Sequence, residues 1–547
     1  MVHYFTHLTS QMKSKWEKAA LCDYKQASYS YKDIATIIEK YHICFRETGI
    51  NKGDRIALCA KNSAKWGISF LASNTYEAVT VPILADFRPE DACRLIDHSE
   101  AKVLFTEPEK FDKMDIAMMP NLRYVFSLID QSLLWCCDEQ TRAIIESRDA
   151  KFEELYPNGM TAADVNYPTD NLDKLAVINY TSGTTSAPKG VMLRYDSFTS
   201  NVMFALDHIP VHEGDQIVSM LPMAHMYGFM FEFLYPLCGG ATVYFLGKAP
   251  TPQLLVGALK DVKPFLLITV PLVMEKIFKN AVLPAVSKPA MKVLLAIPGV
   301  NKVILGKIRQ KLLTTFGGNI QQIIMGGAAL NPEVEKWFKK IGLPYTVGYG
   351  MTEAAPLMAY SYWTEYAPQS CGRAVDRVEV RIDSPDPINV VGEIQARGTN
   401  IMSGYYKNPE ATEAAFTEDG WMRTGDLGVL DAKGNIFIRG RIKNMLLSSN
   451  GQNIYPEEIE AVMNNMPYVQ ESVVVDRGGK LVALVYLDEI ALRKDAVSDE
   501  AIKGILAGNL AEANKQLPIY SKLTSIERMP EPFEKTPKMS IKRFMYK

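Results

Sequence analysis

The chain has 547 residues, of which 47% are hydrophobic and 22% charged, a composition typical of a soluble globular protein with a large core. Lysine and arginine number 60 against 62 aspartates and glutamates, so the formal charge is −2 and no overall positive field attracts nucleic acid. The eight cysteines include no C-x-x-C pair, which favours reduced thiols over a zinc site or a disulfide framework.

The N-terminal residues do not predict secretion. Residues 1–18 lack the apolar run and small-residue cleavage site of a secretory signal, so we expect a cytoplasmic protein. The most apolar stretch, Phe229 to Leu246, is interrupted by Glu232, Pro236 and two glycines. It therefore predicts a buried helix, a turn and a strand rather than a membrane span.

Short β-rich runs alternate with longer helical stretches up to about residue 350, which predicts βαβ units and mostly parallel sheets covered by helices. Ligands of such sheets bind at the carboxyl ends of the strands. From about residue 376 the pattern changes to alternating segments separated by turns, which predicts an antiparallel subdomain. The last hundred residues predict a small α+β domain, with helices over 456–465 and 499–516 and strands over 469–476 and 480–488.

From Lys276 to Phe316 the chain carries eight basic residues and no acidic one. These residues alternate with leucine, isoleucine and valine. Such a segment is either a solvated helical face over the core or a pair of helices lying on a membrane surface. Both interpretations stay open from the sequence, and with the second goes a peripheral contact with the membrane.

The segment YTSGTTSAPKGV, residues 180–191, follows directly on the apolar strand LAVINY. Its backbone N–H groups, its hydroxyls and the lysine at its end suit a polyphosphate, although an ordinary Ser/Thr-rich turn is the alternative. It is not a Walker A loop, because no second glycine precedes the lysine. The candidate phosphate ligands are Thr181, Ser182, Gly183, Thr184, Thr185 and Lys189.

This segment closely resembles the signature loop of the adenylate-forming, or AMP-binding, superfamily, and Ser186 stands where that family usually has glycine. Further segments follow in the family's order. LPMAHMYG, residues 221–228, implies that His225 borders the acyl pocket and joins the catalytic candidates. MGGAAL and VGYGMTE, at residues 325–330 and 347–353, follow β-rich runs, which would place them at strand ends beside the phosphate loop.

The resemblance implies roles for the residues of these two segments. Gly326, Gly327 and Ala328 would line the adenine and the acyl carboxylate, and Tyr349 would pack on the adenine with Gly350 and Met351 beside it. Thr352 would bind the α-phosphate. Glu353, assisted by Thr184, would hold Mg²⁺, a hard ion that favours carboxylate and phosphate oxygens.

The resemblance extends to the C-terminal part. Asp426 in WMRTGDLG would accept the ribose hydroxyls, Arg441 would reach the ribose or phosphates, and Lys443 would be the hinge between residues 1–440 and a mobile domain of residues 441–547. The CoA tunnel would be bordered by Ser449, Asn450 and Gly451. In TPKMSIKR, Ser540 stands where the family has its catalytic lysine, so Lys542, with Lys538 as the second candidate, is expected to serve adenylation.

The implied function is ATP-dependent activation of a long-chain fatty acid through an acyl-adenylate, with transfer to coenzyme A. Residues 228–272 are strongly apolar, which points to a fatty acid. No acidic residue there clearly anchors a substrate amino group, and Glu232 is the nearest candidate. Two alternatives remain: an enzyme that loads a carrier protein, and a non-catalytic acyl- or nucleotide-binding relative suggested by Ser540. The sequence does not indicate an oligomeric state.

Overall fold

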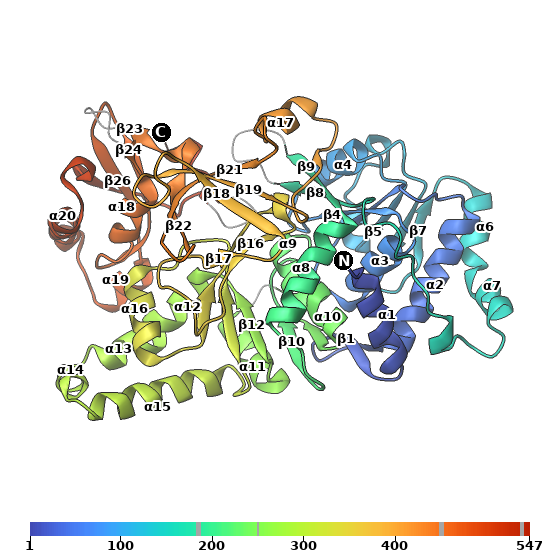
Figure 1. Ribbon diagram of the computed structural model, residues 1–547, viewed down its shortest axis with the longest axis horizontal. Helices are drawn as coiled ribbons and strands as arrows, with labels where there is room; N and C mark the ends of the chain where they lie inside the picture. Colours follow the sequence, from blue (N-terminus) through green and yellow to red (C-terminus); the bar gives the residue numbers. More distant parts are fainter. Residues whose placement is uncertain (182–187, 249–250, 448–452, 536–540, 547) are drawn as a thin grey trace.

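The computed structural model describes residues 1–181, 188–248, 251–447, 453–535 and 541–546, and consists of a large α/β part and a small C-terminal part (Figure 1). The large part combines mostly parallel sheets, covered by helices, with an antiparallel sheet. The fold class expected from the sequence is therefore confirmed.

An eight-stranded sheet forms the N-terminal half, and its centre is parallel. In spatial order its strands are β20 (Gly404–Tyr405), β9 (Lys189–Arg194), β8 (Leu175–Thr181), β4 (Val79–Ile83), β3 (Arg55–Cys59), β5 (Val103–Thr106), β6 (Tyr124–Ser127) and β7 (Leu133–Cys136). β9 and β7 run antiparallel to β8 and β6. The Ser/Thr-rich segment thus joins two strands of a hairpin rather than a strand and a helix.

Both faces of this sheet are buried, because successive residues of a strand point to opposite sides. In β3, Ile56 and Leu58 join the cluster under α2 (Tyr31–Glu47) and α3 (Ala64–Thr75). Ala57 and Cys59 join the cluster under α4 (Pro89–His98) instead. This two-sided burial explains why the strands read as continuous apolar runs.

Two smaller sheets complete the parallel architecture. The first contains β10 (Gln216–Ser219), β11 (Thr242–Phe245), β1 (Ala19–Asp23) and β2 (Ser28–Ser30), of which only β2 is antiparallel to its neighbour. The second contains β12 (Leu266–Thr269), β13 (Gln322–Met325) and β14 (Tyr345–Val347), all parallel.

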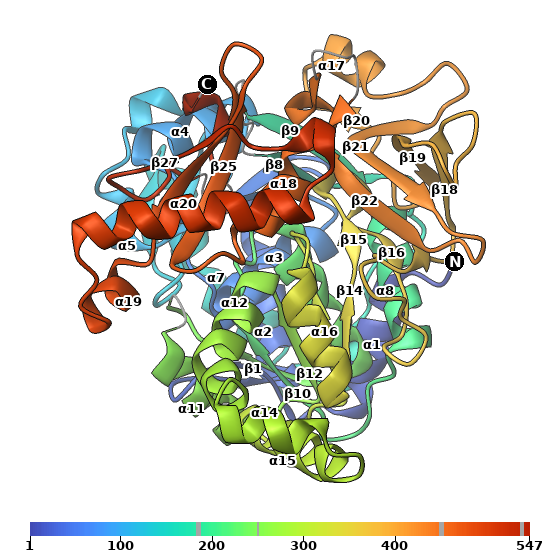
Figure 2. The ribbon, with the colours of Figure 1, turned by 90° about the vertical axis from the view of Figure 1, so that its left-hand side faces the viewer.

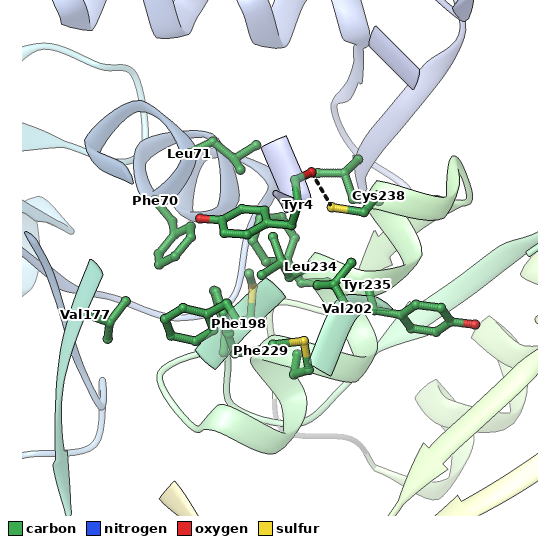
Figure 3. Packing of buried hydrophobic residues seen from close by; sticks show 14 of the residues in the cluster. Tyr4, Phe70, Leu71, Val177, Phe198, Val202, Phe229, Leu234, Tyr235 and Cys238 are labelled. Atoms are coloured by element: carbon green, nitrogen blue, oxygen red, sulfur yellow. Dashed lines mark hydrogen bonds between the residues drawn. The ribbon is translucent and has the colours of Figure 1, made fainter. Parts of the chain in front are cut away.

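The apolar stretch from Phe229 is a buried helical segment, made of η3 (Phe229–Leu234) and α10 (Tyr235–Gly239), followed by a turn and β11. The Phe229 ring packs 4.5 Å from that of Phe70 and 5.6 Å from that of Phe198, centroid to centroid, from α3 and α8 (Tyr195–His208) (Figure 3). The predicted helix, turn and strand are confirmed. Within the described ranges, no helix has the length and apolar character needed to cross a bilayer. The cytoplasmic location stays a prediction.

Residues 349–441 contain two antiparallel sheets, of which the one that begins at Val378 was predicted and the one before it was not. Its larger sheet contains β18 (Val378–Asp383), β19 (Gly392–Gly398), β21 (Met422–Leu430) and β22 (Ile436–Arg441). Its smaller sheet contains β15 (Tyr349–Gly350), β16 (Leu357–Tyr360) and β17 (Arg373–Ala374).

The C-terminal part has hydrophobic clusters of its own. It contains α18 (Pro456–Met463), β25 (Val469–Asp476), β26 (Leu481–Leu487), α20 (Asp499–Gln516) and β27 (Ser525–Arg528). The first four are the predicted helices and strands; β27, which pairs parallel with β26, was not predicted. Separate cores are what a domain needs to move as a unit. The boundary at residues 440 and 441 and the mobility itself stay predictions.

Candidate active site

Two glycine-containing segments meet at one edge of the β12–β13–β14 sheet. β13 leads into Gly326 and β14 into Gly348. The Gly326 amide donates to the Thr269 carbonyl at 3.2 Å, and the Gly348 amide donates to the Met325 carbonyl at 2.8 Å. MGGAAL and VGYGMTE are therefore neighbours at carboxyl strand ends, where parallel sheets bind ligands.

Tyr349, Asp426 and Arg441 form one polar cluster. The Tyr349 hydroxyl donates to Asp426 Oδ2 at 2.7 Å, and Arg441 Nε lies 3.0 Å from Asp426 Oδ1. Asp426 and Arg441 are register partners on β21 and β22, so the sheet itself sets this pair. Burial raises the pKa of the Asp426 carboxyl, while Arg441 and the Tyr349 hydroxyl oppose that rise. Each carboxylate oxygen keeps a second lone pair with which to accept a ribose hydroxyl.

A second cluster surrounds Glu353, which lies in the short helix η5 (Thr352–Ala354). The Tyr405 hydroxyl donates to Glu353 Oε1 at 3.0 Å, and Lys189 Nζ lies 4.8 Å from the centroid of the same tyrosine ring. Burial raises the pKa of Tyr405, so its hydroxyl remains a donor. Lys189 thus lies over the face of the Tyr405 ring, and Glu353 lies at its hydroxyl. Tyr405 was missed from the sequence, because an aromatic residue after a glycine carries no distinctive signal.

The ends of the Ser/Thr-rich segment are anchored at this second cluster. Thr181 and Lys189 are register partners of β8 and β9, and Tyr405 of β20 pairs with Val191. Ser182, Gly183, Thr184 and Thr185 lie outside the described residues, so their predicted phosphate contacts stay predictions.

The backbone from Gly350 to Thr352 is tightly held. A Cβ on Gly350 would collide with the carbonyl oxygen of Pro356, and the Met351 amide donates to that oxygen at 2.9 Å. Thr352 is buried, whereas Gly327 and Ala328 are exposed at the strand edge. Gly327 has a φ of +85°, a left-handed conformation that favours glycine.

His225 precedes the one-turn helix α9 (Met226–Gly228) and is half-buried. Its segment is attached to β8, because Asn179 Nδ2 donates to the Ala224 carbonyl at 2.9 Å. The segment is attached to β13 as well, because the Tyr227 hydroxyl donates to the Ile324 carbonyl at 3.0 Å. The segment that contains His225 is therefore attached to both sheets, and its role at the acyl pocket stays a prediction.

Two further residues of this region were not assigned a role from the sequence. The Tyr227 ring covers Gly326 so closely that a Cβ there would lie 3.1 Å from a ring carbon. Glu232 Oε2 accepts hydrogen bonds from the amides of Met220 and Leu221, both at 2.9 Å. Burial raises the pKa of Glu232 well above its usual range. Glu232 therefore holds the backbone before His225, and its accepting oxygen is engaged by the protein itself.

Of the C-terminal candidates, Lys443 lies near the Tyr349–Asp426–Arg441 cluster, whereas Lys542 pairs within its own segment. Lys443 belongs to the short helix η6 (Ile442–Asn444), and burial together with the nearby Arg441 lowers its pKa. Lys542 Nζ lies 2.8 Å from Glu534 Oε2, a contact within the C-terminal segment rather than with the nucleotide-site candidates. Lys538, Ser449, Asn450 and Gly451 lie outside the described residues.

The donor set fits a magnesium ion that is held partly by a ligand. In the part of the chain that the structure describes, no group of three or more His, Cys, Asp or Glu side chains is arranged around a metal position. Mg²⁺ is usually bound by one or two carboxylates together with phosphate oxygens and waters. Glu353, at the hydroxyl of the tyrosine whose ring Lys189 covers, can supply such a carboxylate.

The family model "AMP-binding enzyme" matches residues 8–406. The chain belongs to the AMP-binding enzyme family. Similar curated proteins include 4-coumarate–CoA ligase 1 of Arabidopsis thaliana, 27% identical over 91% of this chain and 84% of that protein. Long-chain-fatty-acid–CoA ligase FadD15 of Mycobacterium bovis is 27% identical over 85% and 78%. The long-chain-fatty-acid–[acyl-carrier-protein] ligase AEE15 of Arabidopsis thaliana is 26% identical over 87% and 75%.

Solved structures share the fold of this AMP-binding enzyme. ATP-bound MatB from Rhodopseudomonas palustris has a TM-score of 0.77 at 22% identity, and the match covers 100% of this chain and 98% of that one. The anthranilate–CoA ligase AuaEII has a TM-score of 0.78 at 18% identity, over 99% and 96% of the two chains. Both parts of the molecule, large and small, are therefore found in known proteins of this fold.

Proposed function

We propose that this protein is an ATP-dependent acid–thiol ligase that converts a long-chain fatty acid into an acyl-adenylate and transfers the acyl group to coenzyme A. One observation carries the proposal. A single five-residue segment, Tyr349–Glu353, has the buried Asp426 carboxylate bound at its first residue and the Lys189–Tyr405 pair beside its last. These contacts would provide an acceptor for the ribose at one end of the segment and a cation for the phosphates at the other.

ATP fits these two clusters in one orientation. Asp426 accepts the ribose hydroxyls, and Tyr349 lies beside the sugar and the base. Lys189, at the end of the Ser/Thr-rich segment, faces the phosphates as a point charge. The ATP-bound MatB structure, which shares this fold, supports the same class of ligand.

In the first step a carboxylate oxygen of the fatty acid attacks the α-phosphorus of ATP, and the bond to pyrophosphate breaks. The chain contributes position and charge: Thr352 hydrogen-bonds the α-phosphate, and Lys189 together with Lys542 stabilises negative charge on the departing phosphates. Mg²⁺, held by Glu353 and Thr184 when bound, supplies charge neutralisation on the phosphate oxygens.

In the second step the thiolate sulfur of CoA attacks the acyl carbon, and the bond to AMP breaks. A rotation of residues 441–547 about Lys443 would exchange the Lys542 segment for the Ser449–Gly451 segment at the site. Small polar contacts between the two parts support such a rotation, since they are easily exchanged. Asn331 Nδ2 donates to Asn465 Oδ1 at 2.6 Å, and Lys279 Nζ donates to the Asn464 carbonyl at 3.4 Å.

The preference for a fatty acid rests on the surroundings of His225. The helical segment after it is buried, and it is apolar apart from Glu232. Because burial raises the pKa of Glu232 and two backbone amides donate to one of its oxygens, it is a poor partner for a substrate ammonium group, which disfavours an amino acid. The similarity to a long-chain-fatty-acid–CoA ligase supports the same choice, and the equal similarity to a 4-coumarate–CoA ligase makes an aromatic acid the main competitor.

Pyrophosphate exchange tests the proposal. With ATP and Mg²⁺, palmitate and oleate should support exchange of labelled pyrophosphate into ATP, with a higher kcat/KM than 4-coumarate or an amino acid. Exchange with 4-coumarate alone would overturn the fatty-acid assignment, and no exchange with any acid would favour the non-catalytic alternative.

The acceptor is tested separately. Thioester formation should proceed with free CoA as the acceptor, and faster than with a phosphopantetheinyl carrier protein. The similarity to an acyl-carrier-protein ligase makes the carrier the specific rival. Product formation with the carrier and none with CoA would identify the carrier protein as the acceptor, and the proposed adenylation step would stand.

A further inference from the structure

The basic segment identified in the sequence contains a helical hairpin at the edge of the molecule. α14 (Pro289–Ala296) packs against α15 (Val300–Thr315), and residues 297–299 join them. Both views of the ribbon place the two helices at the periphery, on the side of the large part away from α4 (Figures 1 and 2). The hairpin presents its turn outward.

Large apolar side chains are exposed around this turn. Val293 is 64% exposed and Val303 59%, and the others are Leu294, Ile297 and Val300. Single exposed apolar residues need no explanation, but five within eleven residues at the end of a projecting hairpin form a patch that water disfavours. The opposite face of the hairpin supplies Leu295, Leu305 and Leu312 to the core, so the exposed set is not required for folding.

The charges around the patch have one sign. No acidic residue occurs from Lys276 to Pro332, although acids and bases are almost equal in number in the whole chain. Lys288, Lys292, Lys302, Lys307 and Lys311 are exposed, and none of the five forms an ion pair with any other described residue. An uncompensated positive rim therefore borders the apolar turn.

On α15 an exposed apolar side chain and a lysine lie along one face of the helix. Val303, Lys307, Gln310 and Thr314 recur at spacings of three and four residues and so share a face. Beside it a groove of about 410 Å³ opens between α15 and α11 (Pro252–Val262), lined by Lys260, Lys307, Gln310, Lys311, Thr314 and Thr315. Ammonium and hydroxyl donors without a nearby carboxylate suit phosphate oxygens.

We propose that the α14–α15 hairpin is a docking surface for an anionic phospholipid bilayer. The apolar turn enters the boundary between head groups and acyl chains, and the lysines of α14 and α15 contact the lipid phosphates. A second copy of this chain fits the patch poorly, because a symmetric contact would bring lysines against lysines. This inference goes beyond the ligase activity and does not depend on it.

Co-sedimentation of the full chain with vesicles tests the proposal. The protein should bind vesicles of phosphatidylcholine with phosphatidylglycerol and bind those of phosphatidylcholine alone much more weakly. The combined changes Lys292→Gln, Lys302→Gln and Lys307→Gln should weaken binding by roughly 100-fold, since each lysine near an anionic surface contributes about a fivefold factor. The combined changes Val293→Ser, Ile297→Ser and Val303→Ser should weaken it by roughly tenfold.

Matched controls lie on the C-terminal part and in the antiparallel subdomain. Ile490→Ser with Ile519→Ser alters two apolar residues that are more exposed than those of the hairpin. Lys433→Gln, Lys480→Gln and Lys503→Gln together alter three exposed lysines. Both control variants should bind as the wild type does. Equal binding to the two kinds of vesicle, or an equal loss in the controls, would overturn the proposal. So would a wild-type dimer in sedimentation velocity that the serine variant of the hairpin converts to monomer without altering vesicle binding.

Discussion

The polar clusters around Asp426 and Glu353 and the lysine segment of the C-terminal part are held in different ways. In the clusters, Asp426 is fixed by Tyr349 and Arg441, and Glu353 by Tyr405, so these carboxylates stand ready without any rearrangement of the backbone. In the C-terminal segment Lys542 is engaged by Glu534, a residue of its own segment. Preorganised groups bind, whereas a group engaged elsewhere must first be released.

This difference suggests that nucleotide binding and the chemical step are separable properties of the chain. Binding would depend on residues set by sheet register, such as Asp426 opposite Arg441. Adenylation would depend in addition on the position of the C-terminal part that carries Lys542. Variants of the two regions should therefore affect different kinetic constants.

The largest effect is expected for Asp426→Ala. Removing the carboxylate that we propose accepts both ribose hydroxyls should lower kcat/KM for ATP by roughly 1000-fold, because each hydrogen bond to a charged group contributes about 1.5–3 kcal/mol. Pyrophosphate exchange at varied ATP concentration measures the loss. Asp376→Ala, at an exposed aspartate paired with His208, is the matched control and should change neither kcat nor KM for ATP.

A smaller ATP effect than a fatty-acid effect in Asp426→Ala would contradict the proposed ribose role. Loss of the thermal transition would mean instead that the Tyr349–Asp426 contact is needed for folding. Asp426→Asn separates these outcomes, since the amide keeps one acceptor and the packing.

Lys542→Ala should lower the rate of adenylation by roughly 100-fold, the usual scale for removing one group that stabilises developing charge. The transfer of a supplied acyl-adenylate to CoA should stay close to wild type, because that half-reaction does not use the lysine. Lys515→Ala, another exposed lysine that pairs with a nearby glutamate, is the control. Wild-type adenylation in Lys542→Ala would leave Lys538 as the remaining candidate, tested by Lys538→Ala.

Tyr227→Ala probes the large part on the acyl side. Removal of the ring beside Gly326 should raise kcat/KM for 4-coumarate relative to palmitate by about tenfold, because pocket volume of this size typically changes selectivity by 1–3 kcal/mol. Tyr227→Phe keeps the ring and should keep the wild-type ratio. An unchanged ratio in the alanine variant would show that Tyr227 does not line the acyl pocket.

The sequence predicts the parts of the molecule that depend on local pattern. The central strands of the parallel sheets, the buried segment after His225, and the helices and main hairpin of the C-terminal part follow from periodicity and turn residues. It also predicts that MGGAAL and VGYGMTE meet, because parallel strands end at one edge.

Contacts that depend on long-range register were beyond the sequence. The pairing of β20 with β9 brings Tyr405 to Glu353 from 52 residues away, and no local signal announces it. The same holds for Glu232, whose partners at Met220 and Leu221 are backbone amides. The strand β9 was missed for another reason, since the Ser/Thr-rich loop before it resembles the start of a helix as much as a hairpin.

The smallest effect concerns the stability of the C-terminal part, where Glu460 is buried beside Arg543, the neighbour of Lys542. Burial raises the pKa of Glu460 to about 7, although Arg543 opposes the rise. The folded state therefore holds the proton more tightly than the unfolded chain. The stabilisation from this group is complete below the unfolded pKa of about 4.5 and is lost as the pH rises through 7.

Amide hydrogen exchange in α18 and β25 should accordingly report a local opening free energy that falls between pH 5 and 7, on the order of 1 kcal/mol. Glu460→Gln, which stays neutral, should remove this dependence and leave that of the large part unchanged. Opening that becomes harder as the pH rises would contradict the assignment. Arg543, which contacts Glu460, is the neighbour of Lys542 in the sequence. A C-terminal part that becomes less stable near neutral pH would therefore release Lys542 from Glu534 more easily.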